Sequence, residues 1–271
     1  MSPDVIFRAI AGFRLVTNDP ARLAAFYRAI GFDVGEAAPI PVADMKLLGL
    51  AGAGSRIAMS LGPSRVDLES FDNSGRPYPG DTTACDLVFQ HLALVTDDAE
   101  AAWRRARDAG ATPISRGGMV VLPKSAGGAT AIKLRDPEGH PLEFIQFPRG
   151  ANPDWKATGI MGIDHSAISV SDVAASRRFY ASHGLSEAGV TVNHGLTQDA
   201  LHGLDGVEVD VVPMNPADKP PHVEMLGYRR PVGRALGPLS TNDLAATRIV
   251  WRSNADGLIR DPDGHLHQLS R

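Results

Sequence analysis

The sequence has few of the features that would set it apart from ordinary globular proteins. Its single cysteine, Cys85, cannot form an internal disulfide, which favours a reducing, cytoplasmic location. No apolar run is long enough to cross a bilayer, and the first residues lack the basic and apolar regions of a signal peptide. The net charge is only −4, without runs of like charge. We therefore expect a cytoplasmic protein that binds neither nucleic acid nor membrane.

One pattern occurs three times along the chain. A short strand is followed by an Asn/Asp or Ser/Asp helix cap, an amphipathic helix and a glycine that ends the helix. The three copies cover residues 13–34, 91–110 and 166–189. Apolar runs separated by turns follow each helix and predict three further strands. Each copy therefore predicts a β-α-β-β-β module.

A fourth copy opens at residues 245–253 and is shortened. His91 aligns with Arg248, whereas Asp136 aligns with Asp261, so 32 residues are missing between these points. This corresponds to about one helix and one strand. Segments 73–84 and 148–159 are rich in proline and glycine and are typical of linkers. We expect an N-terminal half, residues 1–150, with modules one and two, and a C-terminal half, residues 151–271, with module three and the truncated module four.

A hairpin motif closes the second module and recurs at the end of the chain. It reads LRDPEGHPLEFIQF at residues 134–147 and LIRDPDGHLHQLSR at residues 258–271. Asp-Pro and Gly supply the turn between two strands. The first copy places the carboxylate of Glu143 inside an apolar strand, where an unpaired charge is costly to bury. Glu143 therefore needs a charged partner or a metal ion, while the second copy has Gln268 at this position.

The repeated modules and the DPxGH hairpin together resemble the vicinal oxygen chelate superfamily. This superfamily includes glyoxalase I, methylmalonyl-CoA epimerase, the fosfomycin and bleomycin resistance proteins and the extradiol dioxygenases. The resemblance covers nearly the whole chain. It implies an α+β fold of four βαβββ modules, the fourth shortened, which form two cup-shaped half-barrels. It says little about the reaction, since one scaffold hosts many chemistries.

In proteins that this sequence resembles, two modules form a cup, and each gives the metal one residue from its first strand and one from its last. The second and third modules offer complete pairs: His91 with Glu143, and His165 with Glu224. The first and fourth modules are incomplete and offer Gly12 with Asp67 and Arg248 with Gln268. Pairing of modules one with two and three with four would leave two partial sites. We favour pairing of the second with the third, which gives one complete site.

Strand parity predicts which side chains surround such a site, because residues two apart share a face. The predicted pocket residues are Phe89, Ile145, Phe147, His222 and Tyr228. This wall is mostly apolar and suits a small, largely apolar substrate that grips the ion with two adjacent oxygens. His194 and His202 could also line the pocket, but we favour positions in loops or at the surface for both.

The resemblance to glyoxalase implies proton-transfer chemistry of an isomerase, epimerase or lyase, with Glu143 or Glu224 as the base. The ligand types suit one divalent ion, which could be Ni, Co, Zn, Mn or Fe. One alternative is an Fe(II) extradiol-type dioxygenase, since two histidines and one carboxylate are the ligands of such sites. Another is a drug-binding or resistance protein without catalysis. The chain is expected to be a monomer or a homodimer.

Overall fold

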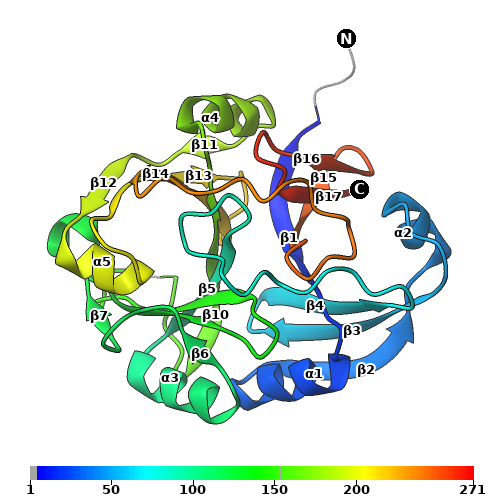
Figure 1. Cartoon of the computed structure of the whole chain (residues 1–271), viewed down its shortest axis with the longest axis horizontal. Coiled ribbons are helices and arrows are strands. Elements are labelled where there is room, and N and C mark those ends of the chain that lie inside the picture. The colour runs from blue at the N-terminus through cyan, green and yellow to red at the C-terminus, as the bar shows by residue number, and fades with distance from the viewer. Residues whose placement is uncertain (1–4, 153) are drawn as a thin grey trace.

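The computed structural model describes residues 5–152 and 154–271, which form two curved sheets (Figure 1). The ten-stranded sheet, hereafter the inner cup, has the order β11-β13-β14-β10-β5-β9-β8-β6, with β12 paired to β13 and β7 paired to β8. The seven-stranded sheet, hereafter the outer cup, has the order β16-β17-β15-β1-β4-β3-β2. The fold is therefore mixed α and β in two cups, as the sequence predicts.

The inner cup consists of modules two and three. Module two contains β5 (Gln90–Thr96), α3 (Ala99–Asp108), β6 (Thr112–Pro113), β7 (Val120–Val121), the 3₁₀ helix η1 (Lys124–Ala126), β8 (Thr130–Arg135) and β9 (Pro141–Gln146). Module three contains β10 (Ile160–Ser169), α4 (Val173–Ser182), β11 (Ser186–Glu187), β12 (Thr191–His194), α5 (Leu196–His202), β13 (Glu208–Asn215) and β14 (His222–Arg230). The side chains of Asp98 and Asp172 cap α3 and α4 by accepting a backbone N–H three residues ahead, as the sequence pattern predicts.

The outer cup consists of modules one and four. Module one contains β1 (Phe7–Val16), α1 (Pro20–Ala29), β2 (Asp33–Pro39), α2 (Val42–Leu47), β3 (Gly54–Leu61) and β4 (Ser64–Phe71). Module four contains only β15 (Arg248–Ser253), β16 (Gly257–Arg260) and β17 (Leu266–Ser270). Residues 248–271 are all described and include no helix, so the predicted shortening is confirmed.

The central pair of antiparallel strands in each sheet decides which modules share a cup. In the inner cup β5 pairs with β10, and in the outer cup β1 pairs with β15. The predicted pairing of the second module with the third is therefore confirmed. The predicted boundary at residue 150 falls in the connection between β9 and β10, and each cup combines strands from before and after it.

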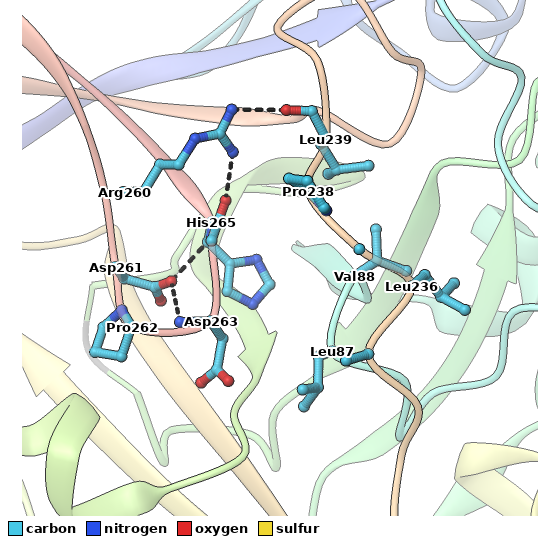
Figure 2. Close-up of a pocket in the computed structure, with 13 residues that line it drawn as sticks. Leu87, Val88, Leu236, Pro238, Leu239, Arg260, Asp261, Pro262, Asp263 and His265 are labelled. Carbon is cyan, nitrogen blue, oxygen red and sulfur yellow. Dashed lines mark hydrogen bonds between the residues drawn. The ribbon is translucent and has the colours of Figure 1, made fainter.

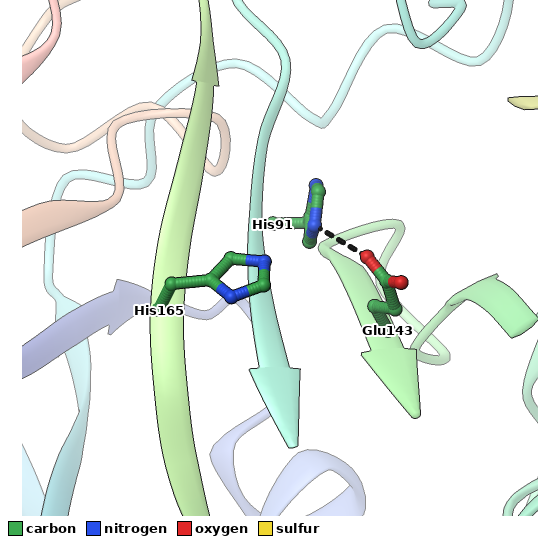
Figure 3. Close-up of side chains that lie close together, drawn as sticks. All are labelled: His91, Glu143 and His165. Atoms are coloured by element: carbon green, nitrogen blue, oxygen red, sulfur yellow. Dashed lines mark ion pairs between the residues drawn. The ribbon is translucent and has the colours of Figure 1, made fainter. Parts of the chain in front are cut away.

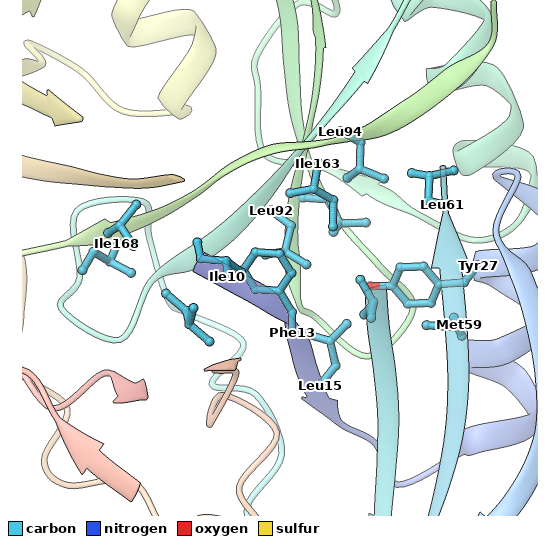
Figure 4. Close-up of a cluster of buried hydrophobic side chains, with 14 of the residues drawn as sticks. Ile10, Phe13, Leu15, Tyr27, Met59, Leu61, Leu92, Leu94, Ile163 and Ile168 are labelled. Atoms are coloured by element: carbon cyan, nitrogen blue, oxygen red, sulfur yellow. The ribbon is translucent and has the colours of Figure 1, made fainter. Parts of the chain in front are cut away.

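The main hydrophobic core lies between the two cups (Figure 4). Leu92 and Leu94 of β5 point into it beside Phe13 and Leu15 of β1. Because side chains alternate along a strand, the opposite face of β5 carries His91. The packing between the cups therefore fixes which face of the inner sheet is available for a site.

The two repeated motifs bind each other across the modules. The hydroxyl of Tyr27, in α1, donates to Asp136 Oδ2 in the first DPxGH turn at 3.2 Å. The hydroxyl of Tyr180, in α4, donates to Asp261 Oδ2 in the second such turn at 3.0 Å. Each helix tyrosine is therefore a partner of the hairpin turn in the following module, which explains why both motifs recur together.

The connections between modules form a second reciprocal link. Arg76 donates its backbone N–H to Asp243 Oδ1 at 2.8 Å, and its guanidinium contacts Oδ2. Arg234 makes the same two kinds of contact with Asp86. Arg76 and Asp86 lie in the connection between β4 and β5, and Arg234 and Asp243 lie in the connection between β14 and β15, so the two links tie these connections to each other. None of the helices in residues 5–152 and 154–271 combines the length and the apolar character needed to cross a membrane.

In the outer cup, the place of a metal site is taken by a buried ion-pair network. Arg248, at a position equivalent to His91, is completely buried and contacts the buried carboxylate of Glu69. Glu69 also pairs with Arg14 at 2.9 Å and with Arg56 at 2.7 Å. Burial alone would raise the pKa of Glu69, but attraction by these three arginines outweighs it and lowers the pKa. The network satisfies buried charge without a metal.

We expect Glu69→Ala to destabilise the protein by about 3–5 kcal/mol, because it leaves the buried charge of Arg248 without its main partner. Urea unfolding measures this loss. Glu36→Ala, which removes an exposed carboxylate from β2 at the edge of the same sheet, serves as the matched control and should change stability by less than about 0.5 kcal/mol. Equal effects of the two substitutions would contradict a stabilising role for the network.

Candidate metal centre

The four predicted ligands lie on one face of four adjacent strands. They are His91 on β5, Glu143 on β9, His165 on β10 and Glu224 on β14. Ala93 is the register partner of both His165 and Glu143. Ala167 is the register partner of both His91 and Glu224. The large polar side chains therefore alternate with two buried alanines, whose small size leaves room for the polar groups to converge.

The structure brings three of the four ligands together and places the fourth beside them. Possible ligand atoms of His91, Glu143 and His165 all lie within 4.8 Å of one another (Figure 3). His91 Nε2 is 2.8 Å from Glu143 Oε2. Glu224 Oε1 is 3.8 Å from His165 Nε2. The four groups thus face one small volume from both halves of the inner cup.

The ring nitrogens of the two histidines indicate that this volume suits a cation. Both nitrogens of His91 and Nε2 of His165 are buried without a hydrogen-bond partner among the described residues. The short contact between His91 Nε2 and Glu143 lacks the direction of a hydrogen bond. Buried polar atoms nearly always have a partner. Imidazole nitrogens and carboxylate oxygens that meet in this way fit a divalent metal ion.

Asp164 holds the ring of His165 in place. Asp164 Oδ2 is 2.9 Å from His165 Nδ1, and Oδ1 accepts a hydrogen bond from Trp155 Nε1 at 3.2 Å. This contact leaves Nε2 facing the site, in the usual carboxylate–histidine–metal arrangement. Asp164, His165 and His222 also form a group with ligand atoms within 4.8 Å. Because both Asp164 oxygens already have partners, we assign Asp164 to orienting His165 and not to the metal.

A cavity of about 270 Å³ opens beside these groups. Of the predicted pocket residues, Ile145, Phe147 and His222 line it. Phe89 does not, because it is completely buried with its ring edge against His91. Tyr228 does not line the cavity either, and its hydroxyl contacts Nδ1 of His202, which does.

The cavity wall is more polar than strand parity predicts, because much of it comes from elements other than the ligand strands. Helix α5 contributes Gln198 and His202, and β8 contributes Lys133. The favoured position of His202 in a loop or at the surface is wrong, and the alternative holds, because His202 is buried at the end of α5 and lines the cavity, while His194 is exposed. The helix packs against β7 and β8, so module three closes the cup over module two.

A second cavity of about 350 Å³ lies between the turn at residues 260–265 and the segment 235–239 (Figure 2). Its charged groups already have partners within the fold. Arg260 donates to the carbonyls of Gly264 and Leu239, and Asp261 Oδ1 accepts the backbone N–H groups of Asp263 and His265. The inner cup, with its unpartnered nitrogens, is therefore the stronger candidate for a functional site.

Comparison with known proteins agrees with this architecture. Residues 9–144 match the family model of the Glyoxalase/Bleomycin resistance protein/Dioxygenase superfamily. The chain belongs to this superfamily. The matched region spans modules one and two, and the four-module organisation extends the family's fold through the rest of the chain.

Solved structures with the same superfamily fold cover almost the whole chain. Glyoxalase I from Zea mays has 15% sequence identity, covers 97% of this chain and 92% of its own, and superposes with a TM-score of 0.62. A proposed dioxygenase from Bacillus subtilis subsp. subtilis str. 168 has 15% identity, covers 97% of this chain and 85% of its own, and has a TM-score of 0.57. None of the curated proteins matches the sequence. At this identity the structural similarity shows the fold alone.

Lys133 is a site residue that the superfamily resemblance did not indicate. It lies on β8, is the register partner of Glu143 and is only 3% exposed. Its Nζ is 4.0 Å from Glu143 Oε2 and 3.5 Å from His202 Nδ1. The sequence did contain a signal, since a lysine within the apolar run AIKL stands opposite Glu143 when the DPxGH hairpin is folded.

The charged groups of the site shift one another's pKa in opposite directions. Burial would raise the pKa of Glu143, but attraction by Lys133 dominates and lowers it to about 2. Burial, together with repulsion by Lys133, lowers the pKa of His91 to about 3. Burial would also lower the pKa of His165, but Glu224 and Asp164 raise it to about 9. Without a metal, His165 is therefore protonated at neutral pH, whereas His91 is neutral and Glu143 is ionised.

We expect the stability of the metal-stripped protein to decrease at alkaline pH because of His165. Its folded-state pKa of about 9 lies above the ordinary value of about 6.5, so the stabilisation is complete below pH 6.5 and disappears as the pH rises through 9. The difference in unfolding free energy between wild type and His165→Asn should shrink over this range by on the order of 3 kcal/mol. Urea unfolding at several pH values measures it, and a constant difference would contradict the assignment.

Proposed function

We propose that the inner cup binds one divalent metal ion through His91, Glu143, His165 and Glu224, and that the protein is a glyoxalase-like enzyme. The observation that carries this proposal is the set of buried ring nitrogens on His91 and His165 that have no hydrogen-bond partner and face carboxylates. These ligand types suit Ni, Co, Zn, Mn or Fe. The reaction is proton-transfer chemistry, such as isomerisation, epimerisation or lyase chemistry, on a small substrate with two adjacent oxygens.

When bound, a divalent ion would polarise a carbonyl oxygen and make the neighbouring C–H more acidic. Glu224 is the better placed of the two candidate bases. Glu143 is held between His91 and Lys133, whereas the described residues give the Glu224 carboxylate no hydrogen-bond donor, and its side chain is 19% exposed towards the cavity. Glu224 can therefore take the proton from one carbon and return it to the next.

The remaining cavity residues bind and orient the substrate. Ile145, Phe147 and Leu226 provide an apolar surface for its hydrocarbon part. Burial of this surface excludes water from the carbon that loses its proton. A cytoplasmic location, a monomeric or homodimeric state and the division into halves at residue 150 remain predictions.

Elemental analysis of the purified protein tests the metal site directly. We expect one equivalent of a divalent ion per chain, and loss of that ion in the His91→Ala/His165→Ala double variant, which removes both imidazole ligands. The His183→Ala/His194→Ala double variant is the matched control, because both residues lie outside the site, and it should retain the ion. If neither wild type nor variant holds an ion after reconstitution, the proposed metal site is wrong.

Exchange of a substrate C–H with solvent deuterium separates the roles of the two glutamates. With hydroxyacetone as the probe, NMR in D₂O should show exchange catalysed by wild type and a loss of about 100-fold or more in Glu224→Gln, with metal content retained. Glu143→Gln should instead lower metal content, because Glu143 lies against His91. Unchanged exchange in Glu224→Gln would exclude it as the base.

The second candidate is an Fe(II) extradiol-type dioxygenase. The specific observation in its favour is that His91, His165 and Glu143 form a group with possible ligand atoms within 4.8 Å of one another, since two histidines and one carboxylate are the ligands of Fe(II) oxygenases. The similar Bacillus subtilis protein is itself described as a proposed dioxygenase. Oxygen uptake with catechols by the Fe(II)-loaded protein, retained in Glu224→Gln, would favour this candidate over proton transfer.

A further inference from the structure

We propose that Lys133 and Gln198 form a subsite that binds a carboxylate of the substrate beside the metal ligands. This inference rests on the proposed function, and it narrows the substrate to small carboxylic acids that carry an oxygen on the carbon next to the carboxylate. Both residues line the same cavity as Glu143 and Glu224, from β8 and α5.

The ammonium group of Lys133 lacks good hydrogen-bond acceptors within the protein. It is 97% buried, yet its nearest acceptors are 3.5 Å away at His202 Nδ1 and 4.0 Å away at Glu143 Oε2. Both separations exceed the usual 2.7–3.2 Å of an N–H···O bond, and an ammonium has three donors. A buried cation with unused donors is stabilised by an acceptor that a bound ligand supplies.

The contacts of His202 with Gln198 and Tyr228 explain why His202 is a poor hydrogen-bond acceptor for Lys133. His202 Nε2 lies 3.2 Å from Gln198 Oε1, so this nitrogen carries the proton and donates. Nδ1 is then the acceptor, and the hydroxyl of Tyr228 already contacts it. The single lone pair of Nδ1 is thereby used, so the 3.5 Å contact with Lys133 is a weak one, and the ion pair with Glu143 at 4.0 Å is the other contact of the ammonium group.

The contact between His202 and Gln198 leaves the amide nitrogen of Gln198 as a second buried donor at the cavity. Because Gln198 Oε1 accepts from His202, its Nε2 group is directed elsewhere, and Nε2 is buried without a partner among the described residues. Gln198 is only 2% exposed. The ammonium of Lys133, which has only long contacts, and the unpartnered amide N–H₂ of Gln198 line the same cavity and are donors suited to an anionic oxygen of a substrate.

The carboxylates of the protein are not available for this role. Asp164 holds His165 and Trp155, while Glu143 and Glu224 are assigned to the metal. A carboxylate on the substrate would supply the close acceptor that Glu143, at 4.0 Å, does not. The cavity volume of about 270 Å³ restricts this substrate to a small molecule.

Calorimetric titration of the zinc-loaded protein with lactate and with lactamide tests the proposal, because these probes have nearly the same shape and differ in charge. We expect wild type to bind lactate at least about 10-fold more tightly than lactamide, the range expected for a charge-assisted hydrogen bond. Lys133→Met should weaken lactate binding about 10-fold and leave lactamide binding unchanged. Gln198→Leu should weaken lactate binding by a smaller factor, and Lys133→Arg should keep part of the preference.

Lys46→Met is the matched control, since it removes an equal charge from the exposed face of α2 in the outer cup. It should leave binding of both probes unchanged. Equal binding of lactate and lactamide by wild type, or unchanged lactate binding in Lys133→Met, would overturn the subsite while zinc binding still supports the proposed function. Loss of zinc in both Lys133 variants would instead make Lys133 a positioning residue for Glu143. Failure of wild type to bind zinc would overturn the proposed function itself.

Discussion

The antiparallel pairing of β5 with β10 is the constraint on which the candidate site depends. It places His91 opposite Ala167 and His165 opposite Ala93, so that the two imidazoles share one face of the sheet. The parallel neighbours on either side then bring one glutamate to each half of the cup. A shift of one residue in this register would turn the ligand side chains towards the core. The apolar packing behind β5, between the two cups, therefore also maintains the polar site in front of it.

The two cups have the same architecture but differ in how their buried charged and polar groups are paired. In the inner cup, carboxylates and imidazoles face one another with nitrogen atoms left unpartnered. In the outer cup, Arg248 replaces the first ligand and binds the buried Glu69. A larger side chain at Gly12 would be strained, because a Cβ there would lie 2.8 Å from the carbonyl oxygen of Arg65. The outer cup therefore has a buried ion-pair network at the position that the four candidate ligands occupy in the inner cup.

Short repeated patterns in the sequence predicted those features of the fold that neighbouring residues determine. Helix caps, the DPxGH hairpin and the shortened fourth module were all visible as repeats, and the resemblance of these repeats assigned the ligand positions and the module pairing. Asp164 was missed because strand alternation places it on the face opposite to His165. A register irregularity between Ile163 and His165 allows it to reach the ring of its neighbour. Lys133 and Gln198 were missed because they enter the site through the folding of β8 and α5 around it, which strand parity on the ligand strands does not describe.

Anomalous diffraction from crystals of the metal-loaded protein tests the central claim most directly. Data collected on both sides of the absorption edge of the loaded metal locate every bound ion. The account predicts one strong peak between His91, Glu143, His165 and Glu224 and none beside Arg248 in the outer cup. An ion bound only at the surface, or held by Asp164 and His222 without His91 and Glu143, would contradict it.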